Sequence, residues 1–427
     1  MELEPRARVT FGVAYRPKSI CQLVFSILLV IGTNFCFITL GLAQQTHDVD
    51  GPSAPSDLQT AQATPGQATQ ATQTTSSDSQ STALQKKKKK KKKGTPRGVF
   101  AAAPIPISNP AIGAGIVPVV GYIFPFSTKD KISPPSVLGA GGLITNNGSR
   151  AFAFGGQLFV KENRYQITAA YGRGNIDYDI YGTGIAENLK LPLVQTGNVF
   201  DAELLRRVWW MLFVGPRFIA GDSLITINQN STPNFPLPPD LGLHTNLVAI
   251  GARATWDTSS NRFYPLQGSF FTFTSDFFSQ DLGSKYTYQS YKTRFDKYWS
   301  LSKNQVLAYD GYFCATGGSP PFYGNCIYGT SSELRGYTAG RYFDRYMLAT
   351  QAEYRLALRW RLGVVAFGGI GGVVAGQNQY LQASHFLPSG GGGLRFDLSP
   401  KYHVNLRADL ARGTDGHTFT LGILEAF

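Results

Sequence analysis

The sequence has few charged residues and no helical periodicity. Only 16% of the residues are charged, whereas aromatic residues make up 13%, and 47 of the 427 residues are glycine. After the N-terminal region, apolar residues do not recur every three or four positions over any length, which excludes helical bundles and strand–helix alternation. This composition is typical of a β-rich protein whose surface does not all face water.

The sequence also lacks the patterns of catalysis and of metal binding. No Gly-x-Ser-x-Gly motif occurs, and the glycines 390–393 are not followed by the Lys and Ser/Thr of a phosphate-binding loop. A Ser–His–Asp site that uses His403 or His417 with Asp409 is disfavoured. We therefore expect no enzyme, no cofactor and no metal site. No metal-ligand spacing is found among the five histidines, which are His47, His244, His385, His403 and His417.

The net charge of +13 is mostly local. Eight of these charges belong to the run Lys86–Lys93, which leaves 13 − 8 = +5 for the rest of the chain. Without a basic helix or zinc-finger spacing, we expect no nucleic-acid partner. The lysine run could lie on anionic lipid headgroups or an acidic cell-wall polymer. It could equally be a solvated spacer that self-repulsion keeps extended.

The N-terminal region predicts export. Residues 1–43 combine Arg16 and Lys18 with a mostly apolar stretch, and Gly41-Leu42-Ala43 offers small residues for cleavage of a signal peptide. The apolar stretch approaches membrane-spanning length, so an uncleaved anchor is the alternative. Residues 44–98 are rich in Gln, Thr, Ser, Ala and Pro and predict a disordered periplasmic linker.

Residues 99–427 predict an all-β domain, because alternating segments are separated by turn residues. An even number of about 16 strands favours a transmembrane antiparallel β-barrel. The segments run over about 113–126, 136–145, 150–161, 164–173, 175–182, 198–208, 210–221, 245–257, 268–280, 286–300, 305–316, 346–359, 361–373, 388–398, 403–412 and 417–427.

Side-chain alternation and loop lengths predict how the barrel is oriented. Apolar faces should meet lipid, and aromatic residues near strand ends should form an interfacial girdle, among them Tyr286, Tyr288, Tyr291, Tyr298 and Trp299. If the terminal residue is periplasmic, the long connections should be extracellular. These long connections are 127–135, 183–197, 222–244, 317–345 and 374–387.

Two of the four cysteines, Cys314 and Cys326, flank a short loop-like stretch. In an exported protein they could form a disulfide that braces this loop, and the alternative is two unpaired thiols. The other two cysteines, Cys21 and Cys36, lie in the N-terminal apolar stretch.

The segment 331–355 begins as a Gly-rich charged loop and ends as an alternating strand. Its motif Leu334-Arg335-Gly336-Tyr337 resembles the signature loop of the BamA/TamA-type outer-membrane assembly superfamily, also called bacterial surface antigens. The turn 256–269 and the closing hairpins 391–427 are similar to those of the same family. The resemblance covers about residues 104–427 and implies a location in the outer membrane of a diderm bacterium.

The resemblance also implies roles for particular residues. Arg335 should fold into the lumen and pair with Glu353. The family's second acidic position is occupied by Gly369, so Asp344 or Asp409 would have to help. The family's assembly machinery reads a C-terminal signal, which here consists of Phe419, Leu421, Ile423 and the terminal Phe427.

The resemblance leaves two functions open. The first is an insertase or translocation barrel that opens between its first and last strands, where Pro104, Pro106, Pro110 and Pro118 remove hydrogen-bond donors. The second is a passive pore or structural surface antigen, because residues 44–98 are too short and too polar for the family's client-binding POTRA domains. The implied partners are outer-membrane lipid, the barrel assembly machinery, and nascent outer-membrane proteins or a periplasmic protein.

Overall fold

The structure is a computed structural model that describes residues 98–109, 112–127, 129–130, 132–181, 190–228, 243–261, 264–329, 333–338, 341–374, 386–399 and 404–427. The expected signal peptide, the lysine run and all of the expected linker except Gly98 lie outside the described residues. No helix in the described part of the chain is long and apolar enough to cross a membrane.

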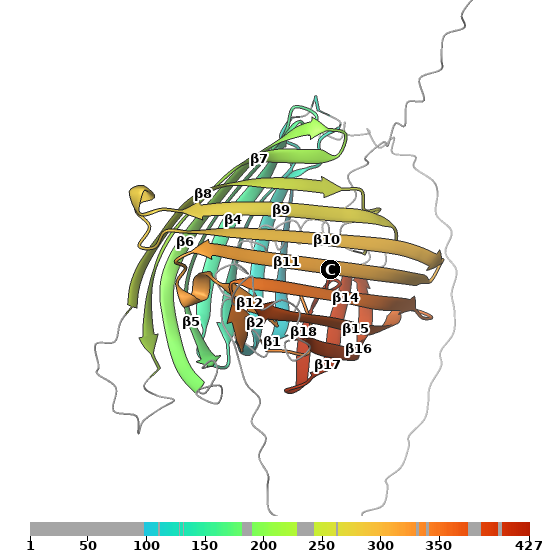
Figure 1. The fold of residues 1–427 in the computed structure, drawn as a ribbon. Coiled ribbons are helices and arrows are strands. Elements are labelled where there is room, and N and C mark those ends of the chain that lie inside the picture. The colour runs from blue at the N-terminus through green and yellow to red at the C-terminus, as the bar shows by residue number, and fades with distance from the viewer. Residues whose placement is uncertain are drawn as a thin grey trace, which may run out of the picture. The chain divides into compact units, whose positions relative to one another are not determined.

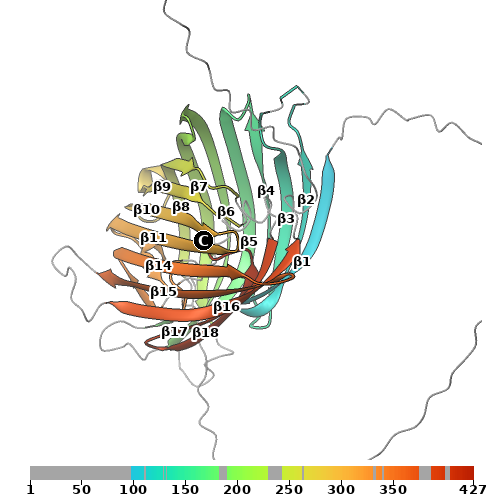
Figure 2. The ribbon, with the colours of Figure 1, turned by 90° about the vertical axis from the view of Figure 1, so that its right-hand side faces the viewer.

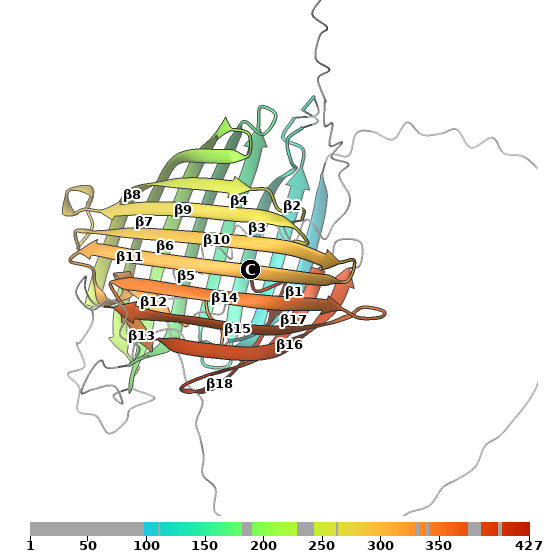
Figure 3. The same cartoon turned by 45° about the vertical axis from the view of Figure 1, so that its right-hand side comes forward.

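Sixteen antiparallel strands close into one barrel, so the predicted fold class and strand number are confirmed. Each strand pairs with its neighbours in the sequence, except that β11 pairs with β14 and the barrel closes between β1 and β18. Figures 1 and 3 show strands β9, β10, β11, β14 and β15 in this order across one wall. The pair β12–β13 forms a separate small sheet within the connection between β11 and β14.

The elements have the following bounds: β1 (Val99–Asn109), β2 (Gly113–Phe124), β3 (Ser136–Thr145), β4 (Arg150–Val160), β5 (Tyr165–Tyr181), β6 (Lys190–Trp209), β7 (Leu212–Ile227), β8 (Leu243–Asp257), β9 (Gly268–Phe278), η2 (Gln280–Leu282), β10 (Tyr288–Ser302), β11 (Gln305–Gly318), η3 (Phe322–Gly324), β12 (Cys326–Tyr328), β13 (Tyr342–Asp344), β14 (Tyr346–Ala357), β15 (Leu362–Val374), β16 (Leu387–Ser399), β17 (Val404–Gly413) and β18 (Gly416–Ile423).

Strand β14 shows why alternating sequences build this wall. Gln351, Glu353 and Arg355 are buried inside the barrel, whereas Leu348, of the opposite parity, is 52% exposed on the outside. Successive side chains of a strand point to opposite faces, so polar and apolar residues separate between lumen and lipid.

Two strand assignments were wrong, although the total is right, and β6 and β7 extend into the predicted long connections 183–197 and 222–244, starting at Lys190 and ending at Ile227 respectively. The strand β1 was not predicted; it contains Pro104 and Pro106, which have no N–H to donate to a ladder. The predicted segments 164–173 and 175–182 form one strand, β5, because Gly172 and Gly174 sit within a continuous pairing with β6 instead of in a turn. These two errors cancel in the strand number.

The same errors place one connection at the wrong end of the barrel. Antiparallel strands put alternate connections at opposite rims, so 127–135, predicted to be extracellular with the other long loops, lies at the rim where β18 ends. We call this the C-terminal rim; its connections are 125–135, 161–164, 210–211, 258–267, 303–304, 358–361 and 400–403. The loop rim carries the connections 110–112, 146–149, 182–189, 228–242, 279–287, 319–345, 375–386 and 414–415.

The predicted aromatic girdle is wrong for two tyrosines of β10. Tyr288 and Tyr298 are only 3% and 4% exposed, and the Tyr298 hydroxyl donates to Asp296, whose side chain is also buried. From Tyr288 to Tyr298, the even-numbered residues of β10 face the barrel interior. Trp299, of the other parity, is 43% exposed and faces outward.

The connection 125–135 is tied to the turn 161–164 by Asp130. The Asp130 carboxylate accepts from the backbone N–H groups of Ser133 and Glu162 at 2.9 and 2.8 Å and from the Ser133 hydroxyl at 2.7 Å. Desolvation by burial raises the pKa of Asp130, but these hydrogen bonds, with one from the Ile132 N–H, lower it to about 2. The ionised carboxylate is therefore the form that holds the two connections together.

Because the pKa of Asp130 is lowered, its hydrogen bonds to the turn 161–164 should be fully present above about pH 3.9, the usual pKa of an Asp side chain. They should be lost as the pH falls through about 2. We expect Asp130→Ala to speed amide hydrogen exchange at Glu162 at neutral pH, whereas the wild type stays protected at about pH 4. Exchange measured by NMR in micelles tests this. Asp281→Ala, at the loop rim, is the control, and equal exchange at Glu162 in both variants would contradict the assignment.

Candidate functional site

The connection between β11 and β14 lies inside the barrel and forms the candidate site. Its buried residues Cys326, Tyr328, Leu334 and Tyr337 pack in one cluster with Met347 of β14 and with other wall residues. Tyr328 and Leu334 have no exposed surface. An apolar loop surface that is buried against the wall keeps the connection in the lumen.

Arg335 is the centre of the site and is 2% exposed. Its Nη1 donates to Glu353 Oε2 at 2.5 Å and to Asp409 Oδ2 at 3.1 Å. Its Nε and Nη2 both donate to Gln351 Oε1, at 3.3 and 3.2 Å. The guanidinium carbon lies 3.4 Å from the centroid of the Phe367 ring. The structure thus brings Arg335 and Glu353 together, and the loop is held by β14, β15 and β17 at once.

The carboxylates that receive Arg335 are shared with other arginines. Glu353 Oε1 accepts from Arg355 Nε at 2.6 Å, and Asp409 Oδ1 accepts from Arg395 Nη1 at 2.5 Å. Arg395 Nε in turn donates to Glu425 Oε2 at 2.7 Å. Such charge-assisted bonds are strong where water is excluded, and they link β14, β16, β17 and the C-terminal residues in one network.

The second carboxylate comes from Asp409 of β17, and not from β15, where the family pattern would place it. A Cβ at Gly369 would lie 2.5 Å from Leu334 Cδ1, so the loop's own leucine occupies the space of a side chain there. Asp344 does not reach Arg335; its Oδ1 accepts from the backbone N–H of Arg345. The missing acidic residue is therefore replaced by one on a more distant strand.

The next two residues of the motif fix the loop backbone. Gly336 has φ +102°, a conformation that favours glycine, and a Cβ there would lie 3.1 Å from Ser389 Cβ. The Tyr337 hydroxyl donates to the carbonyl of Pro388 and accepts from the Thr414 N–H at 3.2 Å. Gly336 and Tyr337 thereby join the loop to β16 and to the β17–β18 turn.

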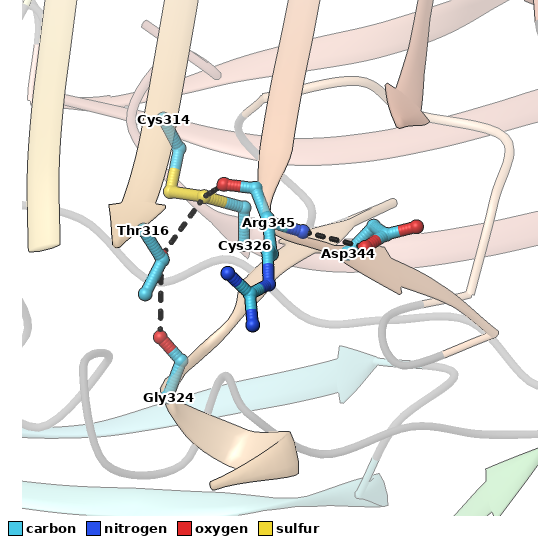
Figure 4. The surroundings of a disulfide bond; sticks show 6 residues. All are labelled: Cys314, Thr316, Gly324, Cys326, Asp344 and Arg345. Carbon is cyan, nitrogen blue, oxygen red and sulfur yellow. Dashed lines mark hydrogen bonds between the residues drawn. A yellow bond between two sulfur atoms is a disulfide. The ribbon is translucent and has the colours of Figure 1, made fainter. Parts of the chain in front are cut away.

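A disulfide closes the first part of the connection. Cys314 of β11 and Cys326 of β12 are joined, with their Cα atoms 5.8 Å apart (Figure 4). Next to it, the Thr316 hydroxyl donates to the carbonyl of Gly324 at 3.4 Å. The disulfide encloses the 3-10 turn η3. Phe322 and Tyr323 of this turn pack near Ile176 and Ile225 on the β5–β7 wall.

The predicted strand 417–427 extends too far, because Phe427 lies beyond the end of β18. Strand β18 ends at Ile423, and Leu424 has φ +71°, which turns the chain away from the strand. The Phe427 carbonyl accepts from Arg355 Nη2 at 2.8 Å, and its ring centroid lies 5.9 Å from the Arg335 guanidinium. Phe419, at 52% exposure, lies on the outer face of β18, where Leu421 and Ile423 share its parity.

Two charged groups inside the barrel were not predicted from the sequence. Arg294 of β10 lies 3.3 Å from Asp310 and 3.4 Å from Glu333 of the loop. On another wall, Arg217 of β7 binds Asp201 of β6 and lies 3.0 Å from Asp276 of β9. The only available signal was the inward parity of isolated charges in otherwise apolar strands, because the partners lie far apart in the sequence.

The network holds the loop in the lumen. Within the described ranges, no group of three His, Cys, Asp or Glu residues could hold a metal ion. Its arginines and carboxylates bind one another, which is the chemistry of a structural anchor.

We expect Arg335→Ala to loosen the loop and destabilise the barrel. Removing one partner of a buried ion pair leaves Glu353 and Asp409 without that partner and typically costs about 3–5 kcal/mol of unfolding free energy. Heat-modifiability on gels and protease sensitivity of residues 319–345 measure the change. The matched control is Arg341→Ala, because the Arg341 side chain is 35% exposed beside Asp415 and its loss should cost about 0–1 kcal/mol. Equal effects of the two variants would contradict the anchor.

Comparison with known proteins places this barrel in a family. The model of the Omp85 superfamily domain matches residues 149–411, which is more than half of the chain. No curated protein matches. The family resemblance seen in the sequence motifs is thereby confirmed.

Solved structures share the fold at low identity. The crystal structure of BamA from Haemophilus ducreyi lacking POTRA domains 1–3 has a TM-score of 0.53 at 14% identity, covering 77% of this chain and 70% of that one. CdiB from Acinetobacter baumannii and from Escherichia coli have TM-scores of 0.50 and 0.51 at 12% and 10% identity. Each match covers 77% of this chain, but only 60% and 63% of the respective CdiB chain. The chain belongs to the Omp85 superfamily and is a β-barrel of the bacterial outer membrane.

Proposed function

We propose that this protein inserts or translocates client proteins through a seam between β1 and β18. In this proposal residues 1–43 direct export, residues 44–98 form a periplasmic linker, and the residues around Phe419 serve as the signal for the barrel's own assembly. The clients are nascent outer-membrane or exported proteins. The observation that carries the proposal is the weak pairing at the seam.

Within the described residues, β1 and β18 are paired at one position only, Ser108 opposite Leu421. The other junction of β18 is continuous: it pairs with β17 from Leu406 opposite Ile423 to Gly413 opposite Gly416. Figure 2 shows the blue N-terminal and the red C-terminal strands meeting at the seam. Each ladder hydrogen bond adds to the resistance against separation, so the barrel should open first here.

Prolines explain why the seam is weak. Pro104 of β1 lies opposite Pro118 of β2. Neither proline has an N–H, so the two residues do not form a hydrogen-bonded pair, and their backbone nitrogens point to the strands on the other sides, β18 and β3. The β2–β3 ladder is accordingly interrupted between Ile116 and Val119. Pro106 has the same parity as Pro104, so at the position level with Ile423, the last residue of β18, the edge of β1 offers no donor.

The strand β1 also extends past the end of β18. With Ser108 opposite Leu421, the last residue of β18, Ile423, lies level with Pro106, and the chain then turns into the lumen at Leu424. The backbone of β1 from Val99 to Ile105 therefore has no residue of β18 opposite it. An exposed strand edge is a template for an added strand, which a client could supply.

The anchored loop favours client handling over the alternative of a passive pore or structural antigen. Residues of the 319–345 connection pack against β14–β17 through Arg335 and against the β5–β7 wall through Phe322 and Tyr323. A lumen that holds such a loop is poorly suited to passive diffusion. The same anchor braces the wall beside the seam while β1 and β18 separate.

A disulfide across the seam tests the proposal. The double variant Ser108→Cys, Leu421→Cys should lose insertion of a client barrel into proteoliposomes when oxidised, and mild reduction should restore it. The control Ala408→Cys, Leu421→Cys joins β17 to β18 at an existing register position and leaves the seam free. If the oxidised seam variant inserts the client barrel at the wild-type rate, the proposal is wrong. Steady single-channel conductance without any client would favour the passive pore.

A further inference from the structure

All five tryptophans of the chain lie at the C-terminal rim. Trp209 and Trp210 stand at the turn between β6 and β7, Trp256 next to the last residue of β8, Trp299 near the end of β10, and Trp360 in the turn between β14 and β15. Four of them are broadly exposed, with Trp210 at 66% and Trp360 at 83%. The loop rim has no tryptophan, so the asymmetry is complete.

The same rim carries the excess of positive charge. Its described connections contain the six basic residues Lys129, Lys161, Arg164, Lys303, Arg359 and Arg361 and the two acidic residues Asp130 and Glu162, or 6 − 2 = +4. The described connections of the loop rim contain the four basic residues Lys285, Arg335, Arg341 and Arg345 and the four acidic residues Asp281, Glu333, Asp344 and Asp415, or 4 − 4 = 0. Arg206 and Arg207, which precede the tryptophan pair by one intervening residue, add further positive charge to the C-terminal rim.

These basic residues form two patches across neighbouring turns. The Arg207 N–H donates to the Arg164 carbonyl at 2.8 Å, and Arg207 Nη2 donates to the Glu162 carbonyl at 3.2 Å, which joins the turns 161–164 and 210–211. The Ala357 N–H donates to the Asn304 carbonyl at 2.9 Å, which joins the turns 303–304 and 358–361. Each patch therefore contains exposed arginines together with exposed tryptophans.

We propose that the C-terminal rim binds the headgroups of anionic phospholipids. Indole rings at the ends of membrane strands lie at the level of the headgroups, and guanidinium groups bind phosphate through paired hydrogen bonds. The barrel's longest connections are at the other rim, which makes the C-terminal rim periplasmic, where the leaflet consists of phospholipid. An acidic soluble partner would account for the arginines, but it would not require broadly exposed tryptophans beside them.

The tryptophans themselves report the binding. The purified full chain in neutral detergent is titrated with brominated phosphatidylglycerol or brominated phosphatidylcholine, whose bromine atoms quench indole fluorescence on contact. We expect phosphatidylglycerol to quench at a concentration at least about tenfold lower, and added salt should weaken this preference. Inorganic phosphate at the same phosphate concentration should not compete, because it lacks the acyl chains that hold the lipid at the rim.

The matched variants carry four substitutions each. Arg164→Gln, Arg206→Gln, Arg359→Gln and Arg361→Gln at the C-terminal rim should abolish the preference for phosphatidylglycerol. Arg150→Gln, Arg173→Gln, Arg345→Gln and Arg412→Gln, all exposed and towards the loop rim, should leave it unchanged. Equal quenching of the wild type by the two lipids, or an undiminished preference in the first variant, would overturn the proposal. So would displacement of phosphatidylglycerol by a polyglutamate peptide, which would mark a protein-docking surface instead. The salt dependence of the wild type tests the proposal even if a variant does not fold.

Discussion

The structure depends on a guanidinium group placed where water is scarce. Arg335 is 2% exposed inside the barrel, and a buried charge is tolerated only with partners that replace its hydration. Glu353 and Asp409 supply these partners from β14 and β17. The loop cannot leave the lumen without stranding both carboxylates, and the two strands cannot move apart without losing their common arginine. One side chain thus fixes a loop and a wall together.

This constraint divides the barrel into a braced part and a weak part. From β14 to β17, long ladders with one bulge between Asp397 and Ser399, the arginine network and the loop reinforce one another. At the seam, β18 pairs with β1 at a single position, and prolines remove hydrogen-bond donors from the edge of β1. The strain of opening would therefore concentrate at the seam. Asp409 on β17 stands one strand away from it, which is close enough to couple the loop to the seam's rigid side.

The sequence predicted what depends on local pattern and missed what depends on distant partners. Alternation in β14 gave the inward face of Glu353, and the motif around Arg335 gave the family. Asp409 was one of two candidates for the second carboxylate, but the sequence could not decide between Asp409 and Asp344, because the choice depends on contacts between strands far apart in the sequence. Local patterns also produced errors. The proline-containing strand β1 was not predicted, and the alternating pattern of the last strand was extended to Phe427 although the strand ends at Ile423.

Hydrogen–deuterium exchange of the barrel in lipid nanodiscs tests directly whether a braced wall lies beside a weak seam. We expect fast exchange in β1 (Val99–Asn109) and slow exchange in β16 and β17 of the wild type. Arg335→Ala should speed exchange in β16 and β17 and leave that of β1 almost unchanged. Exchange in β1 as slow as that in β17, or unchanged exchange of β16 and β17 in Arg335→Ala, would show that the seam is not weak or that Arg335 does not brace the wall.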